Sequence, residues 1–206
     1  MKMQNYLDEI KYAVESTLSV IWSDAEKLEI LQDKLEHLTR ETERGYQYAE
    51  AFQYDEDPDD VMLGVGIHWD TYFGSDKKRY QAETDVDDVN EEIRVREFSR
   101  SAMSGNILQY AKQGISIAHG ELKHCPNGRS IGSQVIKTVI WQGRNQSLHW
   151  EEKSPRQPII DCFDQLSQDI DNRFSQYTSS NLAFDVVKLL NWKAYDSFEK
   201  DMQSLA

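Results

Sequence analysis

The chain has 206 residues, of which 39% are hydrophobic and 29% are charged, and its formal net charge at pH 7 is −13. This length is enough for one sizeable hydrophobic core. The negative charge argues against a protein that coats nucleic acid over its whole surface, and no apolar run approaches the length of a membrane span, which argues against a membrane protein.

The N-terminal sequence MKMQNYLDEI lacks the apolar core of a signal peptide. The two cysteines, Cys125 and Cys162, form no Cys-x-x-Cys motif. Together these features predict a reducing, cytoplasmic setting with free thiols.

Two helices are predicted in the first fifty residues. Residues 4–22 carry apolar side chains at helical spacing, and Ser23-Asp-Ala-Glu26 is typical of a capping box that opens a second helix. The second helix has a leucine seam, which indicates an antiparallel hairpin with the first helix or a dimer contact. The seam consists of Leu28, Leu31, Leu35 and Leu38.

Residues 55–60 are acidic and are predicted to form a solvated turn, because they lack the spaced ligands and central glycine of a calcium loop. Residues 61–73 allow a strand or a helix, and the i, i+4 pair Trp69 and Phe73 favours the helix. Residues 75–90 are polar and predict a loop with part of a helix. We expect residues 1–92 to form an acidic N-terminal helical extension, packed on the same domain as the rest.

Apolar spacing from residue 91 onward predicts a long helix that Gly120 ends. Small residues along it, such as Gly105, predict tight packing against the next helix. Residues 130–152 are predicted to form that next helix, with Ser130 as its cap.

Further helices are expected after the two prolines at 155 and 158. Pro158 suits the first turn of a helix, residues 182–190 form a short helix, and Asn191 caps a final one. Residues 93–206 should therefore form a helical bundle, and the predicted fold class of the chain is all-α.

A chemically suggestive motif lies near the end of the predicted 130–152 helix: Arg144-Asn145-x-x-x-His149. Asn145 and His149 are i, i+4 neighbours and share a face, whereas Arg144 is displaced from His149 by about 140° on an ideal helix. A histidine can exchange a proton with a ribose hydroxyl near neutral pH, and an arginine can hold a phosphate through two parallel hydrogen bonds. These are the parts needed for RNA cleavage without a metal.

A structural role for the motif is the alternative. Arg144 would then cap carbonyl groups at the helix end or pair with Glu151 or Glu152, and His149 would pack beside Trp150.

The motif resembles that of the HEPN domains, small all-helical proteins of bacterial and archaeal defence in which an Arg, usually followed by a polar residue, precedes a His by a few positions. The resemblance covers residues 99–174. It implies a HEPN-like helical bundle and a metal-independent endoribonuclease without a cofactor, which attacks through the RNA 2′-hydroxyl at a composite site in a homodimer. It also implies catalytic roles for Arg144, Asn145 and His149, and a possible antitoxin or regulatory protein partner, as in toxin–antitoxin or antiphage systems.

Charge is unevenly distributed along the chain. Residues 1–92 carry a net charge of −15, residues 93–150 carry 8 basic and 2 acidic residues, net +6, and residues 151–206 carry −4. The motif therefore lies in the only basic segment, in which Arg129, Lys137 and Lys112 are candidates for binding RNA. Alternatively, a basic helix docks on acidic neighbours within the same fold.

No metal site is predicted, because His119, His124 and Cys125 lack the paired spacing of a structural zinc site. The leading hypothesis is thus a HEPN-like endoribonuclease. A non-catalytic HEPN-like module that binds a nucleotide or a protein is the second hypothesis, and a helical interaction protein in which the motif arose by chance is the third.

Overall fold

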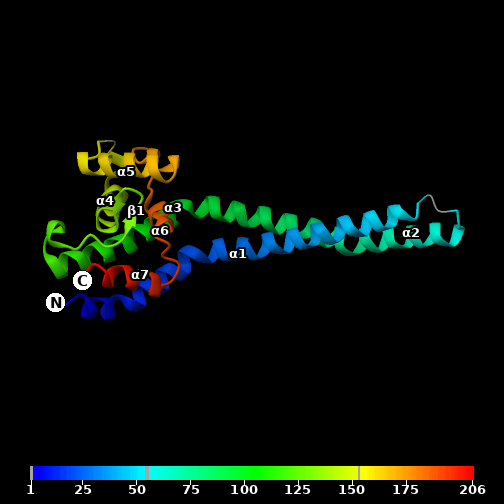
Figure 1. Cartoon of the computed structure of the whole chain (residues 1–206), viewed down its shortest axis with the longest axis horizontal. Helices are drawn as coiled ribbons and strands as arrows, with labels where there is room; N and C mark the ends of the chain where they lie inside the picture. Colours follow the sequence, from blue (N-terminus) through cyan, green and yellow to red (C-terminus); the bar gives the residue numbers. More distant parts are fainter. Residues whose placement is uncertain (1, 54–55, 153) are drawn as a thin grey trace. The chain divides into compact units, whose positions relative to one another are not determined.

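The computed structural model describes residues 2–53, 56–152 and 154–206, which are almost entirely helical (Figure 1). The predicted all-α fold class is confirmed. The α-helices are α1 (Met3–Ala51), α2 (Pro58–Thr71), α3 (Lys77–His119), α4 (Ile136–His149), α5 (Gln157–Asp169), α6 (Ala183–Leu189) and α7 (Tyr195–Gln203). Within the described ranges, none of these helices combines the length and apolar character needed to cross a bilayer.

Shorter elements connect the helices. A π-helical turn, Tyr72–Asp76, joins α2 to α3. A two-stranded antiparallel hairpin, β1 (Ser130–Ile131) and β2 (Gln134–Val135), precedes α4. Short 3-10 turns occupy Leu122–His124, Trp150–Glu152 and Asn172–Gln176.

The chain forms two compact units. The first combines Met1–Trp22 with Arg96–Ala206, and the second is the continuous segment Ser23–Val95. The first part of the expected 1–92 extension thus belongs to the same unit as the C-terminal bundle. Charge follows this division: the second unit contains 8 basic and 21 acidic residues, net −13, whereas the first contains 15 of each and is neutral.

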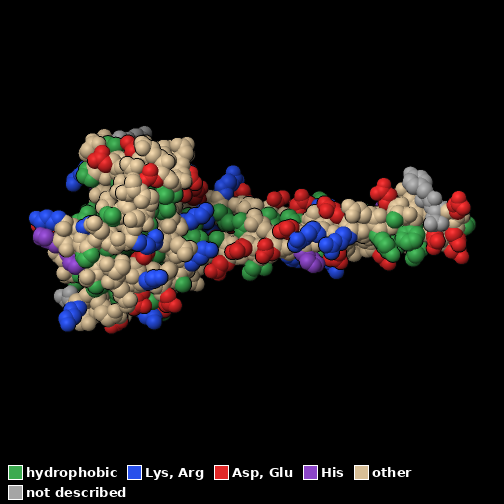
Figure 2. Space-filling model, viewed as in Figure 1, with side chains coloured by type: hydrophobic (Ala, Val, Ile, Leu, Met, Phe, Trp, Pro, Cys, Tyr) green, Lys and Arg blue, Asp and Glu red, His purple; other side chains and the backbone are tan. Residues whose placement is uncertain are grey.

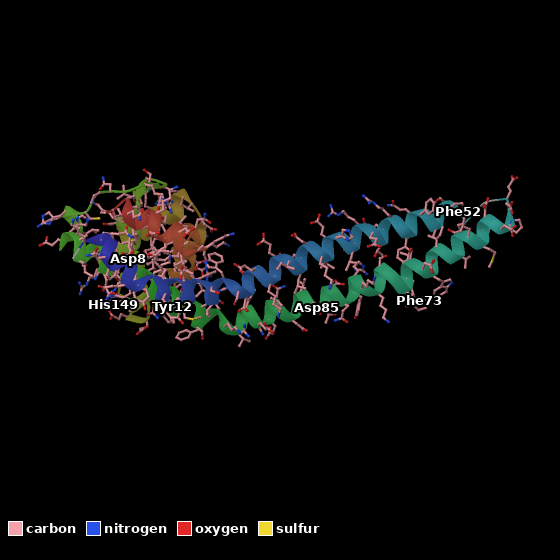
Figure 3. The ribbon with its side chains drawn as sticks, turned by 90° about the horizontal axis from the view of Figure 1, so that it is seen from below. Asp8, Tyr12, Phe52, Phe73, Asp85 and His149 are labelled. Carbon is pink, nitrogen blue, oxygen red and sulfur yellow. The ribbon has the colours of Figure 1, made fainter. Side chains whose placement is uncertain are left out.

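The second unit is an antiparallel helical hairpin (Figures 1 and 3). Its outgoing limb is the later part of α1, and its returning limb is α2, the π-helical turn and the start of α3. Glycines allow the limbs to approach, since a Cβ added at Gly45 would lie 2.3 Å from Oγ1 of Thr71, and one added at Gly64 would lie 2.8 Å from Cβ of Phe52. The Tyr46 hydroxyl crosses between the limbs and donates to Oδ2 of Asp76 at 2.8 Å.

The prediction that Ser23-Asp-Ala-Glu26 opens a second helix is wrong, because α1 runs through these residues without interruption. A capping box acts only where the chain enters from a non-helical conformation, and the apolar spacing here continues from Trp22 to Leu28. The leucine seam consequently does not pair with the first helix. It faces the returning limb of the second unit, where Leu38 is buried beside Lys78 and Gln81.

The prediction of a loop in residues 75–90 is also wrong, since α3 begins at Lys77. Side-chain pairs one turn apart support this polar stretch of helix. Arg79 pairs with Asp76 at 2.9 Å and with Glu83 at 3.5 Å, and the Gln81 amide donates to Asp85 at 3.1 Å.

The helix predicted for residues 61–73 is confirmed as α2 together with the start of the π-helical turn. The Asp57 side chain caps it by accepting from the backbone N–H of Asp59 at 2.9 Å, and Pro58 occupies its first turn. The acidic segment therefore contains the N-cap of α2. The first residue of this segment, Asp55, lies outside the described residues.

In the first unit, α4 contacts α5 and α6 and packs closely on α3. A Cβ added at Gly105 of α3 would lie 3.2 Å from Oγ of Ser147, and one added at Gly143 of α4 would lie 3.1 Å from Val186 and 3.4 Å from Leu108. The predicted close approach through small residues is confirmed. The largest fully buried side chains of this unit are Leu7, Leu18, Ile21, Ile107, Leu108, Ile115, Ile136, Ile140, Phe163, Leu166, Trp192 and Phe198.

The prediction that residues 130–152 form one helix is wrong at its start. Ser130 pairs with Val135 in the β-hairpin rather than capping a helix, and α4 begins at Ile136. Gly132 forms the turn of the hairpin with a φ of +57°, a conformation that glycine adopts readily and that is incompatible with a continuous α-helix. Asp169 holds the turn by accepting from the N–H and the hydroxyl of Ser133 at 2.8 and 2.6 Å.

The C-terminal helices follow the sequence pattern with one exception. Pro158 lies in the first turn of α5, as predicted, and the predicted helix over 182–190 is α6. Asn191 does not cap the last helix, because it has a φ of +55° just after α6. Ala194 is the residue that precedes α7 instead.

Candidate functional site

The motif residues lie on the second half of α4, where the buried stripe of the helix meets its exposed face. Ile136, Val139, Ile140 and Gly143 are buried against the core. Arg144 and Asn145 are consequently half-buried, and His149 ends the helix in an exposed position.

Arg144 is held in place by uncharged neighbours. Its Nε donates to Oε1 of Gln109 on α3 at 2.5 Å, and its Nη1 donates to Oδ1 of Asn145 at 3.3 Å. The Asn145 amide in turn donates to Oε1 of Gln142 at 3.3 Å. Within the described part of the chain, no carboxylate forms an ion pair with Arg144, and burial lowers the pKa of its guanidinium from the usual value.

Lys112 is a second cation close to Arg144. Its Nζ lies 4.6 Å from the centroid of the Trp141 ring, a cation–π geometry. Its pKa is lowered by burial and, to a smaller extent, by the nearby charge of Arg144. Two partly desolvated cations from α3 and α4 are therefore held together without a paired carboxylate, an arrangement that favours a bound anion.

His149 is oriented by Glu152 in the following 3-10 turn. Its Nδ1 lies 2.6 Å from Oε1 of Glu152. A carboxylate oxygen can only accept, so Nδ1 carries the proton and Nε2 is the nitrogen available to a ligand. If the motif had only a structural role, Glu152 was one expected partner of Arg144. In the structure Glu152 bonds to His149 instead.

A single pocket of about 530 Å³ joins these groups. Arg144, Asn145 and His149 line it together with Lys112, and Figure 3 marks His149 within the first unit. The residues around the rest of its wall are Trp141, Gln142, Glu152, Ser154, Pro155, Arg156, Pro158 and Ile159. The structure thus brings together the three predicted catalytic residues and one of the three predicted RNA-binding residues.

Arg156 is a pocket residue that sequence reasoning missed. It lies at the N-cap of α5, between the two prolines. These prolines break the chain after α4 and so return α5 toward the motif. The two prolines could have indicated this residue from the sequence, because a cation at the break between α4 and α5 lies close in space to the end of α4.

Arg129 and Lys137 do not line this pocket. Arg129 donates from Nε and Nη2 to Asp201 at 2.8 and 2.9 Å and from Nη2 to the Leu190 carbonyl at 2.8 Å. Lys137 donates to the Cys125 carbonyl at 2.5 Å. Both cations therefore bond to neighbours within the fold. This agrees with the alternative given above, in which basic residues of this segment dock on other parts of the same fold.

Of the candidate zinc ligands, His119 and Cys125 both bond to the Leu205 carbonyl oxygen, and the Cys125 thiol donates to it at 3.8 Å. His119 Nε2 lies 2.6 Å from the Leu205 carbonyl oxygen. Over residues 2–53, 56–152 and 154–206, no group of three or more His, Cys, Asp or Glu side chains is arranged to hold a metal ion.

Comparison with known proteins finds no matching family model, no curated protein that matches, and no solved structure that matches.

Proposed function

We propose that the chain is a HEPN-like, metal-independent endoribonuclease whose site is the pocket lined by Arg144, Asn145, His149 and Lys112. The observation that carries this proposal is their convergence on one pocket of about 530 Å³. Two cations without carboxylate partners suit a phosphodiester, and a histidine beside them suits proton transfer.

Each group has a distinct part in the proposed reaction. Nε2 of His149 takes the proton of a ribose 2′-hydroxyl, and the 2′-oxygen attacks the adjacent phosphorus. The bond from phosphorus to the 5′-oxygen breaks, and His149 returns the proton to this oxygen, which leaves a 2′,3′-cyclic phosphate and a free 5′-hydroxyl. Arg144 and Lys112 stabilise the charge that develops on the phosphoryl oxygens, and Asn145 keeps the Arg144 side chain in position.

A two-fold dimer belongs to this proposal. Arg144 and His149 of one copy line one pocket, and a second copy facing it across a two-fold axis would bring another Arg and His to the same cleft. Leu148, beside His149, is 50% exposed and offers an apolar contact for such a partner. Light scattering at micromolar concentration should give a dimer, and a monomer that still cleaves RNA would remove this part of the proposal.

The decisive experiment is incubation of the purified chain with total RNA in the presence of EDTA. Cleavage should persist, products should carry cyclic phosphate and 5′-hydroxyl ends, and a substrate with a 2′-deoxy residue at the cut position should resist. His149→Ala should abolish cleavage, whereas His124→Ala, which alters an exposed histidine outside the pocket, should not. Equal activity in both variants would contradict the assignment.

A nucleotide-binding module without catalysis is the second candidate. The pocket volume favours it, because it lies in the range of sites that enclose a small ligand. A ribonucleoside monophosphate would then bind, with affinity that falls as salt rises, and no RNA would be cut.

A further inference from the structure

A continuous apolar face on the second unit has no partner among the described residues. We name it the aromatic face, and it consists of Met62, Val65, Trp69, Tyr72, Phe73 and Tyr80 on the returning limb of the hairpin. These side chains are exposed; Trp69 is 49% and Phe73 65% accessible. Exposed apolar patches of this kind mark interaction sites in proteins that otherwise bury such residues.

The rings on this face are preordered by contact with one another. Trp69 stacks on Phe73 with centroids 5.6 Å apart, and Tyr72 meets both edge-on at 5.7 and 5.1 Å. Tyr72 and Phe73 follow Trp69 by three and four residues, a spacing that brings side chains together on a helix. The cluster lies where α2 passes into the π-helical turn Tyr72–Asp76.

Two grooves flank the ring cluster. One, of about 630 Å³, lies between the limbs and is lined by Tyr46, Glu50, Val65, His68 and Trp69 among others. The other, of about 400 Å³, is lined by Tyr72, Phe73, Asp76, Lys77, Arg79 and Tyr80. Met62, Val65, Trp69 and Phe73 follow steps of three and four residues, which is the spacing that receives the apolar side of a partner helix.

Charge identifies the partner. From residue 45 to residue 80, the stretch that carries this face, the sequence contains eight Asp and Glu residues and three basic residues at 77–79, a net charge of −5. One of the three, Arg79, is paired with Asp76 and Glu83. Figure 2 shows apolar side chains gathered near the end of the hairpin with acidic side chains around them. Such a surface repels nucleic acid and anionic membranes, and it also repels the same face of a second copy.

We propose that the aromatic face docks a basic amphipathic helix of another protein, with the apolar side of that helix against Trp69 and Phe73 and its cations toward the acidic rim. This interaction lies in the second unit and is separate from the pocket on α4. It therefore stands or falls independently of the proposed ribonuclease activity.

A synthetic probe tests this proposal on the full chain. The probe is a labelled amphipathic helix of about 20 residues, or about 30 Å, with leucines on one side and lysines elsewhere; a matched peptide has glutamates in place of lysines. Fluorescence anisotropy should show binding of the lysine peptide, weakening as salt rises, and much weaker binding of the glutamate peptide. Equal affinity for the two peptides overturns the proposal.

Variants separate docking on this face from general attraction to an acidic protein. Trp69→Ser/Phe73→Ser should weaken binding about tenfold or more, and Met62→Lys, at a separate exposed position, should weaken it as well. Tyr12→Ser, which alters an 82% exposed aromatic residue of the first unit, should leave affinity unchanged. Unchanged affinity in the first two variants overturns the proposal. The proposal also fails if sedimentation shows a dimer that these variants convert to monomer, because a second copy of the chain would then cover the face.

Discussion

The Nδ1 atom of His149 and a carboxylate oxygen of Glu152 lie 2.6 Å apart, across one turn of chain that continues directly from α4. Both side chains are about half exposed, so this pair orients the imidazole without contributing much to the core. Glu152 is thus a positioning residue for His149 in the proposed reaction.

Replacing Glu152 should lower activity while leaving the fold unchanged. Glu152→Gln keeps the shape of the side chain but no longer attracts an imidazolium, and we expect cleavage to slow about tenfold, less than the loss on removing the acid–base group itself. Cleavage rates of Glu152→Gln, beside those of Glu151→Gln as the matched control, check this prediction. Equal rates in the two variants would contradict a positioning role for Glu152.

Arg144 should not be replaceable by lysine. Arg144→Lys loses the planar fork that, in the proposed reaction, would bind two phosphoryl oxygens, and it also loses the Nε bond to Gln109. We expect both Arg144→Lys and Arg144→Ala to lose about 10²-fold in cleavage rate and to bind a nucleoside monophosphate more weakly. Gln109→Leu should have a smaller effect, since it removes only the support. A fully active Arg144→Lys would show that charge alone suffices.

The three hydrogen bonds accepted by Asp201 should be important for stability. Its carboxylate accepts from two nitrogens of Arg129 and from Nε1 of Trp192 at 2.8 Å, and it is only 7% exposed. Asp201→Ala leaves a partly buried cation and an indole N–H unpaired, at a cost of about 3 kcal/mol of unfolding free energy. Asp196→Ala, an exposed change on the same helix, should cost less than about 1 kcal/mol. Urea denaturation measures both.

The Asp169 carboxylate should make stability depend on pH on the acid side. The hydroxyl of Ser133, then its N–H, and then the Gln165 amide donate to Asp169 and hold its pKa below the usual value. A carboxylate with a lowered folded-state pKa stabilises the fold above its unfolded pKa of about 3.9, and this contribution disappears as pH falls through the folded value.

The stability difference between wild type and Asp169→Asn should therefore be constant near neutral pH and shrink below about pH 4. Ser133→Ala removes the strongest donor and should weaken this pH dependence. Thermal unfolding of the three proteins across pH gives the comparison, and a difference that persists unchanged into acid would contradict the assignment.

Periodicity predicted most of the fold because burial of one helix face leaves a direct trace in the sequence. The long helix ending at Gly120, the close approach at Gly105 and the helix begun by Pro158 follow from this pattern and from the properties of glycine and proline. It failed where local signals compete. A capping box at Ser23 has the same residues as an ordinary turn of helix, and the short hairpin at Gly132 depends on Asp169, a contact 36 residues away.

The candidate site was predictable in part for the same reason. Arg144, Asn145 and His149 are neighbours in sequence, so their position on one helix follows from spacing. Lys112 and Arg156 join them only through the packing of α3 and the return of α5. Arg129 lies outside the pocket, because it bonds to Asp201, 72 residues later, and net charge along a segment does not reveal such a partner.

The discontinuous first unit affects the order in which the protein can fold during synthesis. Its N-terminal segment is synthesised before the hairpin, yet Trp22 and Leu7 bond to Trp192 and Tyr195, which follow them by 170 and 188 residues. The hairpin of residues 23–95 needs only contacts within itself and can form much earlier. Residues 3–22 can therefore contact α3 first, through Tyr6 and Tyr110, and gain their remaining partners only after residues 192–195 have been synthesised.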